Sequence, residues 1–114
     1  MIELTMTVLG QTITKDFTCH NPVTGQVQDA DALPTSEVFE DTTDTPILTP
    51  TVTKRVGATG NYRLTFTASA ANGFEVDKSY NVIVAATVSG ITAKSRVASF
   101  NLEKAEAHPA HFRV

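Results

Sequence analysis

The stretch that most constrains the fold of this sequence is residues 79–102, which we predict to form a long β-hairpin. Ser89 and Gly90 separate its two arms and suit a tight turn, because glycine adopts a positive φ at little steric cost. Apolar residues in the first arm fall on every second position, which is typical of a strand with one face in a core. These residues are Tyr80, Val82, Val84, Ala86 and Val88.

The second arm of the hairpin carries a conflict of register. If the loop has two residues, Tyr80 faces Ser99, and Phe100 points away from the core. A three-residue loop would bring Phe100 opposite Tyr80, but it would also turn Lys94 and Arg96 toward the core, which is far more costly. We therefore predict a β-bulge near Ala98 and Ser99. The bulge would switch the inward set from Ile91, Ala93 and Val97 to Phe100 and Leu102.

Shorter strands are predicted along the rest of the chain, at residues 2–8, 11–19, 36–40, 51–56 and 60–68. Pro34 favours an edge strand or the start of a strand just after it, and residues 41–50 are predicted to be a loop that crosses between sheets. The pattern predicts an all-β fold, an antiparallel immunoglobulin-like β-sandwich of about seven to eight strands. We expect residues 1–103 to form this single domain and residues 104–114 to form a C-terminal tail.

The composition fits one globular domain. The chain has 114 residues, of which 41% are hydrophobic and 18% charged. Its net charge is −3 and its nine Lys and Arg are scattered, so we expect no nucleic-acid partner. Cys19 is the only cysteine, which excludes an intrachain disulfide. The first residues lack the regions of a signal peptide, and no apolar run approaches the roughly 20 residues that cross a membrane. We therefore expect no membrane partner and synthesis in the cytoplasm.

The sequence holds no catalytic constellation and no phosphate-binding glycine loop. Cys19 and His20 are adjacent in a predicted strand and so point to opposite faces, which prevents a nucleophile and base pair. We predict a half-buried Cys19, a solvent-facing His20, no enzymatic activity and no cofactor. The alternating aromatic residues are expected in the core rather than on a sugar-binding surface; they are Tyr62, Phe66, Tyr80 and Phe100.

Two groups of residues contain side chains that can bind metal ions. His108 and His111 have suitable spacing only on a helix, Pro109 lies between them, and structural zinc generally takes four protein ligands. Loop carboxylates could offer oxygens to Ca²⁺ but lack the regular spacing of a calcium loop, so we interpret them as solvated side chains. These carboxylates are Asp29, Asp31, Glu37, Asp41 and Asp44. No metal site is predicted.

Two runs carry a resemblance to a known group of proteins. GQVQDADALPTSEVFED and ATGNYRLTFTASAANGFEVDKSYNVIVAATVSGITAKSRVASFNL, within residues 25–102, resemble tailed-phage and prophage virion proteins. In that group a Gly-x-Tyr strand, a Tyr-x-Val-x-Val strand, a glycine turn and a last strand ending in Phe form an immunoglobulin-like module. Gly60, Asn61 and Tyr62 also resemble the tyrosine corner of immunoglobulin domains, although the Cys and Trp of antibody domains are missing. The resemblance implies a capsid decoration, head-to-tail, tail or baseplate protein located in the virion.

We expect both chain ends to take part in assembly, with packing on its own domain or addition as a further strand as the alternatives for the C-terminal tail. The C-terminal tail ends in apolar residues that the sandwich does not need, and the N-terminal strand has an apolar face formed by Ile2, Leu4, Met6 and Val8. The predicted partners are copies of the same chain and other virion proteins, bound through strand edges and apolar anchors. The alternative function is a carbohydrate- or ligand-binding module of adhesin type. The predicted partner-binding residues are Ile2, Leu4, Met6, Phe112 and Val114.

Overall fold

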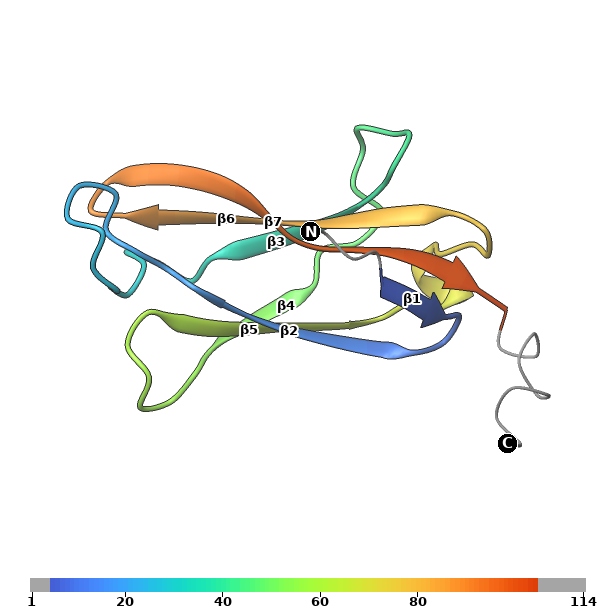
Figure 1. The fold of residues 1–114 in the computed structure, drawn as a ribbon, viewed down its shortest axis with the longest axis horizontal. Coiled ribbons are helices and arrows are strands. Elements are labelled where there is room, and N and C mark those ends of the chain that lie inside the picture. Colours follow the sequence, from blue (N-terminus) through green and yellow to red (C-terminus); the bar gives the residue numbers. More distant parts are fainter. Residues whose placement is uncertain (1–4, 105–114) are drawn as a thin grey trace.

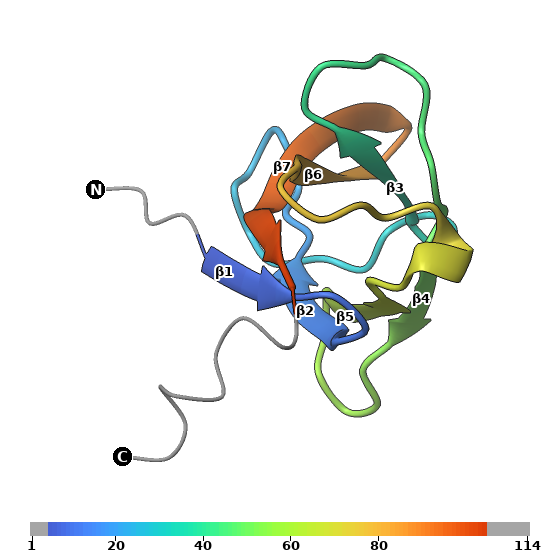
Figure 2. The ribbon, with the colours of Figure 1, turned by 90° about the vertical axis from the view of Figure 1, so that its right-hand side faces the viewer.

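The structure is a computed structural model that describes residues 5–104. Two sheets face one another in two layers, and the only helix among the described residues is a short 3₁₀ turn, Ala70–Asn72 (Figures 1 and 2). One sheet has the order β1-β7-β6-β3 and the other β2-β5-β4. The predicted all-β architecture is therefore confirmed. The strands are β1 Thr5–Val8, β2 Thr12–Thr18, β3 Thr35–Glu40, β4 Thr51–Lys54, β5 Asn61–Thr67, β6 Ser79–Val88 and β7 Ile91–Glu103.

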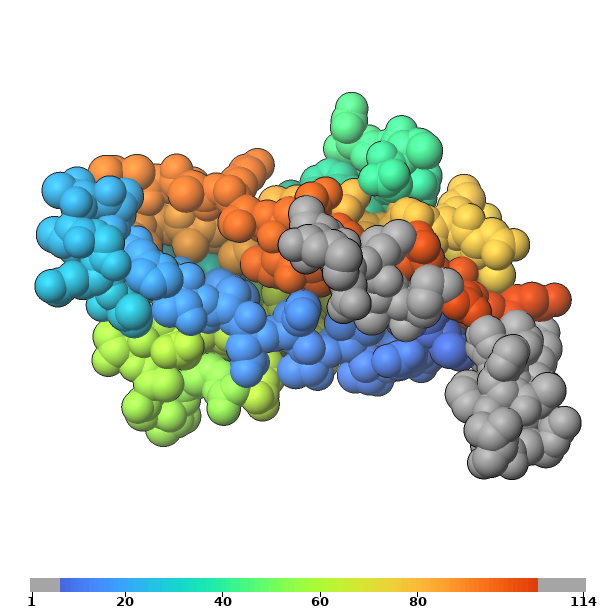
Figure 3. Space-filling view, in the orientation of Figure 1, coloured from blue at the N-terminus to red at the C-terminus, as the bar shows by residue number. Residues whose placement is uncertain are grey.

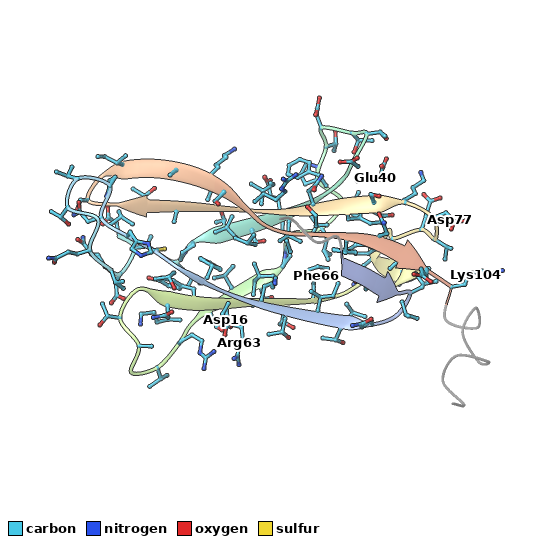
Figure 4. All side chains as sticks on the ribbon, viewed as in Figure 1. Asp16, Glu40, Arg63, Phe66, Asp77 and Lys104 are labelled. Atoms are coloured by element: carbon cyan, nitrogen blue, oxygen red, sulfur yellow. The ribbon has the colours of Figure 1, made fainter. Side chains whose placement is uncertain are left out.

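The core lies between the two sheets and is centred on an aromatic cluster. Phe74 lies in the connection between β5 and β6, and its ring centroid is 4.8 Å from that of Tyr80 and 5.8 Å from that of Phe66. Phe100 of β7 completes the cluster, 5.6 Å from Tyr80. All four are buried, as is Tyr62, and Figure 4 shows Phe66 between the layers. The predicted core position of the aromatic residues is confirmed.

The hairpin of β6 and β7 contains the predicted bulge. Val82 pairs with Ala98 and Ile83 with Arg96, so Val97 is the extra residue. The irregularity lies one residue before the predicted position. It brings Phe100 opposite Tyr80, and both side chains are buried. Ile91, which pairs with the buried Val88, is on the face of the hairpin that is turned toward the three-stranded sheet. It is nevertheless 48% exposed, because the hairpin tip extends past the end of that sheet (Figure 1).

The turn at Ser89 and Gly90 is held by the long connection between β2 and β3. Both turn residues have positive φ, 50° and 79°, as a two-residue hairpin loop of this kind requires. The Asp31 carboxylate accepts hydrogen bonds from both of their backbone N–H groups, at 3.0 and 2.8 Å. Asn21 and Gln28 donate to the Ser89 hydroxyl. These bonds compensate the left-handed conformation of Ser89.

The prediction of a purely antiparallel sandwich is wrong at the first strand. β1 pairs with β7 in parallel, with Thr5 beside Phe100 and Val8 beside Glu103. The turn after Val8 then leads the chain from this sheet into β2 of the other sheet. Thr7 is the buried residue of β1, at 3% exposure. Val8 therefore lies on the outer face, not on the core face.

The connection from β3 to β4 crosses between the sheets, as predicted for residues 41–50. β3 is an edge strand, as Pro34 indicated. Part of the crossing loop lies along this edge: Val38 N–H donates to the carbonyl of Leu48 at 2.9 Å and its carbonyl accepts from Ile47 at 2.8 Å. The β3 edge is thereby partly covered. Within the described residues no helix is long and apolar enough to cross a membrane.

An ion-pair network lies on the outer face of the three-stranded sheet. The Asp16 carboxylate accepts hydrogen bonds from Arg63 Nε at 2.9 Å and from Arg55 Nη1 at 2.7 Å, and Figure 4 shows Asp16 and Arg63 side by side. The hydrogen bond from Arg63, together with the positive charges of both arginines, lowers the pKa of Asp16 below its ordinary value of 3.8. The network links β2 to β5 across their shared ladder.

We expect Asp16→Asn to lower the urea midpoint of unfolding slightly at neutral pH and not at all in strong acid. A lowered pKa in the folded state stabilises the protein above the unfolded-state value of 3.8, and this contribution is lost as the pH falls through the folded-state pKa. The measurement is urea unfolding at a series of pH values. Asp44→Asn, at an exposed loop residue, is the control and should show no such trend. A constant difference between Asp16→Asn and wild type at every pH would contradict the prediction.

Candidate partner-binding site

The four-stranded sheet has a long stretch of strand edge without a neighbour in the described part of the chain. β1 pairs with β7 only at residues 100–103, so residues 91–99 of β7 pair with β6 alone. We call residues 91–99 the open edge. Unpaired strand edges are templates for pairing with another chain, whereas the opposite edge, β3, is partly covered by Leu48. The open edge is therefore the candidate partner-binding site.

Two hollows lie between the open edge and β2, the nearest edge strand of the other sheet; β2 and β7 run along the same side of the molecule (Figure 3). The first hollow, which we call the groove, has a volume of about 560 Å³ and is lined by Thr7, residues 11–15 and residues 96–100. The second, which we call the slot, has about 190 Å³ and lies nearer the hairpin tip. Its apolar walls are Phe17, Cys19, Val84, Ala86, Val88, Ile91, Ala93 and Val97.

Lys15 gives the groove an unusual charge. It pairs with Leu64, which is fully buried, so the register turns Lys15 toward the space between the sheets. Arg96 borders the same groove, but it pairs with Ile83, between the buried Val82 and Val84, so the register turns its side chain to the outer face of the sheet. Among the described residues neither cation forms an ion pair, in contrast to Lys54, Arg55, Arg63 and Lys78. An inward-facing lysine is one way in which an edge strand avoids unwanted pairing, and it also leaves the groove without a counter-charge from the described chain.

Exposed apolar side chains gather at the end of the sandwich that carries the hairpin tip. The connection from β2 to β3, the turn from β4 to β5 and the tip of the β6–β7 hairpin meet at this end (Figure 1). Large apolar residues with more than a third of their surface exposed occur, among the described residues, only there. They are Val23, Val27, Leu33, Val56 and Ile91. This apolar end adjoins the slot through Ile91.

The predicted partner-binding residues lie largely outside the described part of the chain. Ile2, Leu4, Phe112 and Val114 belong to the termini, residues 1–4 and 105–114. Only the backbone of Met6 is described, and it pairs with Asn101. Sequence reasoning missed the open edge itself, because strand order decides which edge lacks a neighbour. The groove had one sequence signal, Lys15 between Ile13 and Phe17 in an alternating strand.

Cys19 and His20, the adjacent residues considered as a nucleophile and base, do not form a reactive pair. His20 is exposed, as predicted, whereas Cys19 is 6% exposed and so buried in the core rather than half-buried. Burial, and secondarily the negative charge of Asp29, raises the pKa of the Cys19 thiol, which keeps it protonated and unreactive. No described aromatic side chain is exposed, so the described residues form no aromatic platform for a sugar.

Three of the loop carboxylates, those of Asp29, Asp31 and Asp41, form local hydrogen bonds. Asp29 accepts a hydrogen bond from the Gly60 backbone N–H and lies 3.5 Å from Lys54 Nζ. Asp41 accepts from Asn81, and Asp31 holds the hairpin turn. Within residues 5–104 no three His, Cys, Asp or Glu side chains are arranged to hold a metal ion. His108 and His111 lie outside the described residues.

The described residues form a two-layer β-sandwich in which the open edge of the four-stranded sheet adjoins an apolar slot. Comparison of the chain with protein-family models, with curated proteins and with solved structures found no match. The features of the chain that bear on its function are therefore the open edge and the sequence pattern of residues 25–102.

Proposed function

We propose that this chain is a non-enzymatic structural protein of a tailed-phage virion and that it assembles with copies of itself and other virion proteins. The observation that carries the proposal is the open edge beside an apolar slot of about 190 Å³. A partner strand added to residues 91–96, the part of the open edge nearest the hairpin tip, would gain backbone hydrogen bonds from the edge and place alternate side chains in the slot. The sequence pattern of residues 25–102 supports the virion context.

We further propose that the sandwich is of immunoglobulin type. If the strands are lettered A to G in chain order, β2, β5 and β4 correspond to B, E and D, and β3, β6 and β7 to C, F and G, as in immunoglobulin sheets. β1, the A-equivalent, departs from that arrangement because it pairs with β7. Tyr80 begins the F-equivalent strand, and its hydroxyl accepts a hydrogen bond from the Glu75 backbone N–H at 2.8 Å. That is the geometry of a tyrosine corner. The corner predicted at Tyr62 is wrong, since the Tyr62 hydroxyl instead accepts from Ala30 in a distant connection.

One substitution tests the open edge without disturbing the hairpin. Val88 and Ile91 flank a two-residue turn and so form a hydrogen-bonded pair. Hydrogen-bonded and non-hydrogen-bonded pairs alternate along the two strands, so Lys94, three residues after Ile91, belongs to a non-hydrogen-bonded pair and directs its N–H away from β6. Lys94→Pro therefore removes one outward donor and leaves the β6–β7 ladder intact. Lys94→Ala is the matched control, because it removes the charge and keeps the donor.

The expected result has two parts. Mass spectrometry of particles from the phage or lysogen that carries the gene should detect the chain as a virion component. Purified protein should self-associate in light-scattering measurements, and Lys94→Pro should weaken that association about tenfold while Lys94→Ala stays near wild type. Absence from purified particles would overturn the virion proposal. Equal association of both variants would overturn the role of the open edge.

A further inference from the structure

We infer that the groove is the docking site of residues 1–4 of the same chain, with Glu3 as the counter-ion of Lys15. The pairing of β1 gives the first reason. Thr5 lies beside Phe100 and each later residue beside the next one of β7. Extended backward by the same register, Leu4 falls beside Ser99 and Glu3 beside Ala98, along the open edge and over the groove.

The parity of β1 gives the second reason. Thr7 lies beside Leu102, and both side chains are buried between the sheets. Because strand side chains alternate, a continued strand turns Glu3 to the same side as Thr7. Ala98, the expected neighbour of Glu3, pairs with the fully buried Val82 and lines the groove. Glu3 would therefore face into the groove.

Charge gives the third reason. Lys15 and Arg96 are the only charged residues that line the groove, and the described chain offers neither of them an ion-pair partner. Glu3 is the only charged residue among residues 1–4. A single carboxylate would thus enter a hollow in which Lys15 is the described charged residue on the inward-facing side, because Arg96 pairs with the outward-facing Ile83. Lys15 is exposed, so the pair is expected to have the modest strength of a surface ion pair.

The backbone pattern makes the inference specific to one amide. Leu9 N–H donates to the Glu103 carbonyl at 2.8 Å, so the odd-numbered residues at this end of β7 direct their backbone groups toward β1. Every second residue of β7, Glu103, Asn101 and then Ser99, therefore directs its N–H toward β1. If the parallel pairing continues, the Ser99 N–H donates to the carbonyl of Glu3. Exchange of the Ser99 amide hydrogen therefore reports docking.

Docking also has a consequence for assembly, which rests on the proposed function. With Glu3 turned inward like the buried Thr7, the alternation of a continued strand would turn Ile2 and Leu4 outward, to the same side as Val8. The docked segment would present an apolar stripe at the edge of the four-stranded sheet. Ile2 and Leu4 are then contact residues for a partner protein rather than core residues.

Hydrogen exchange of the full-length protein, followed by NMR, tests the docking. Deletion of residues 2–4 should speed exchange at Ser99 about tenfold, the effect of losing one hydrogen bond of roughly 1 kcal/mol or slightly more. Glu3→Lys and Lys15→Glu should each speed it about two- to fivefold, and the double reversal should restore the wild-type rate. Lys94→Glu, on the open edge outside the groove, is the control and should leave the Ser99 rate unchanged.

Two results would overturn the inference. Exchange at Ser99 that is the same with and without residues 2–4 would show that the segment does not pair there. Protection that rises with protein concentration would assign the groove to the segment of a second copy instead. A separate measurement is the incorporation of the Leu4→Ser variant into particles. If this variant shows both normal Ser99 protection and normal incorporation, the docking inference stands, and the proposed role of the apolar stripe in assembly is wrong.

Discussion

Replacing Phe74 by alanine is expected to lower the free energy of unfolding by about 3–5 kcal/mol. Phe74 is 2% exposed, and its ring contacts those of Phe66, Tyr80 and Phe100, so the truncation opens a cavity where the two sheets meet. Because a domain of this size has a total stability of about 5–15 kcal/mol, the loss is a large fraction of the whole. Urea unfolding followed by circular dichroism measures it.

Two companion substitutions separate ring packing from other effects. Phe39→Ala removes a half-buried ring from an edge strand and should cost about 1 kcal/mol. Tyr80→Phe keeps the packed ring but removes the acceptor of the Glu75 N–H, which should also cost about 1 kcal/mol. If Phe74→Ala cost no more than Phe39→Ala, Phe74 would not be part of a single packed core.

The β-hairpin shows which features a sequence of this kind determines. Both the apolar alternation from Tyr80 to Val88 and the position of Phe100, which a regular hairpin would turn away from the core, can be seen within the hairpin itself. Together they required a bulge, which the structure has at Val97. Ser89 and Gly90 are local in the same way. Predictions that depend only on neighbours within one hairpin were therefore accurate to about a residue.

Features that depend on strand order were not accessible from the sequence. The residues of β1 alternate equally well in a parallel or an antiparallel pair, so its partner β7 and its buried face at Thr7 were not predicted. Tyr62 and Tyr80 both follow a turn and begin a strand, and only their hydroxyl partners distinguish the corner. The open edge is likewise a property of the sheet, which is why the sequence directed attention to the termini.

Deletion of Val97 is expected to leave the protein folded, at a cost of about 1–2 kcal/mol from the loss of one half-buried side chain. Val97 is the extra residue of the bulge. Without it, Arg96 and Ala98 become adjacent and still pair with Ile83 and Val82, so the pairing of β6 and β7 becomes regular. Every inward residue of β7 keeps its face. Far-ultraviolet circular dichroism and urea unfolding check this outcome.

Deletion of Asn101, only four positions further along β7, should instead cost at least about 3–5 kcal/mol or prevent folding. If the bulge absorbed this deletion, Phe100 would move opposite Ser79 and out of the aromatic cluster; if the bulge persisted, the rest of β7 would reverse its faces. Both deletions shorten the same strand by one residue, so chain length cannot explain a difference between them. Similar losses of stability for the two would mean that Val97 is not the residue that corrects the register.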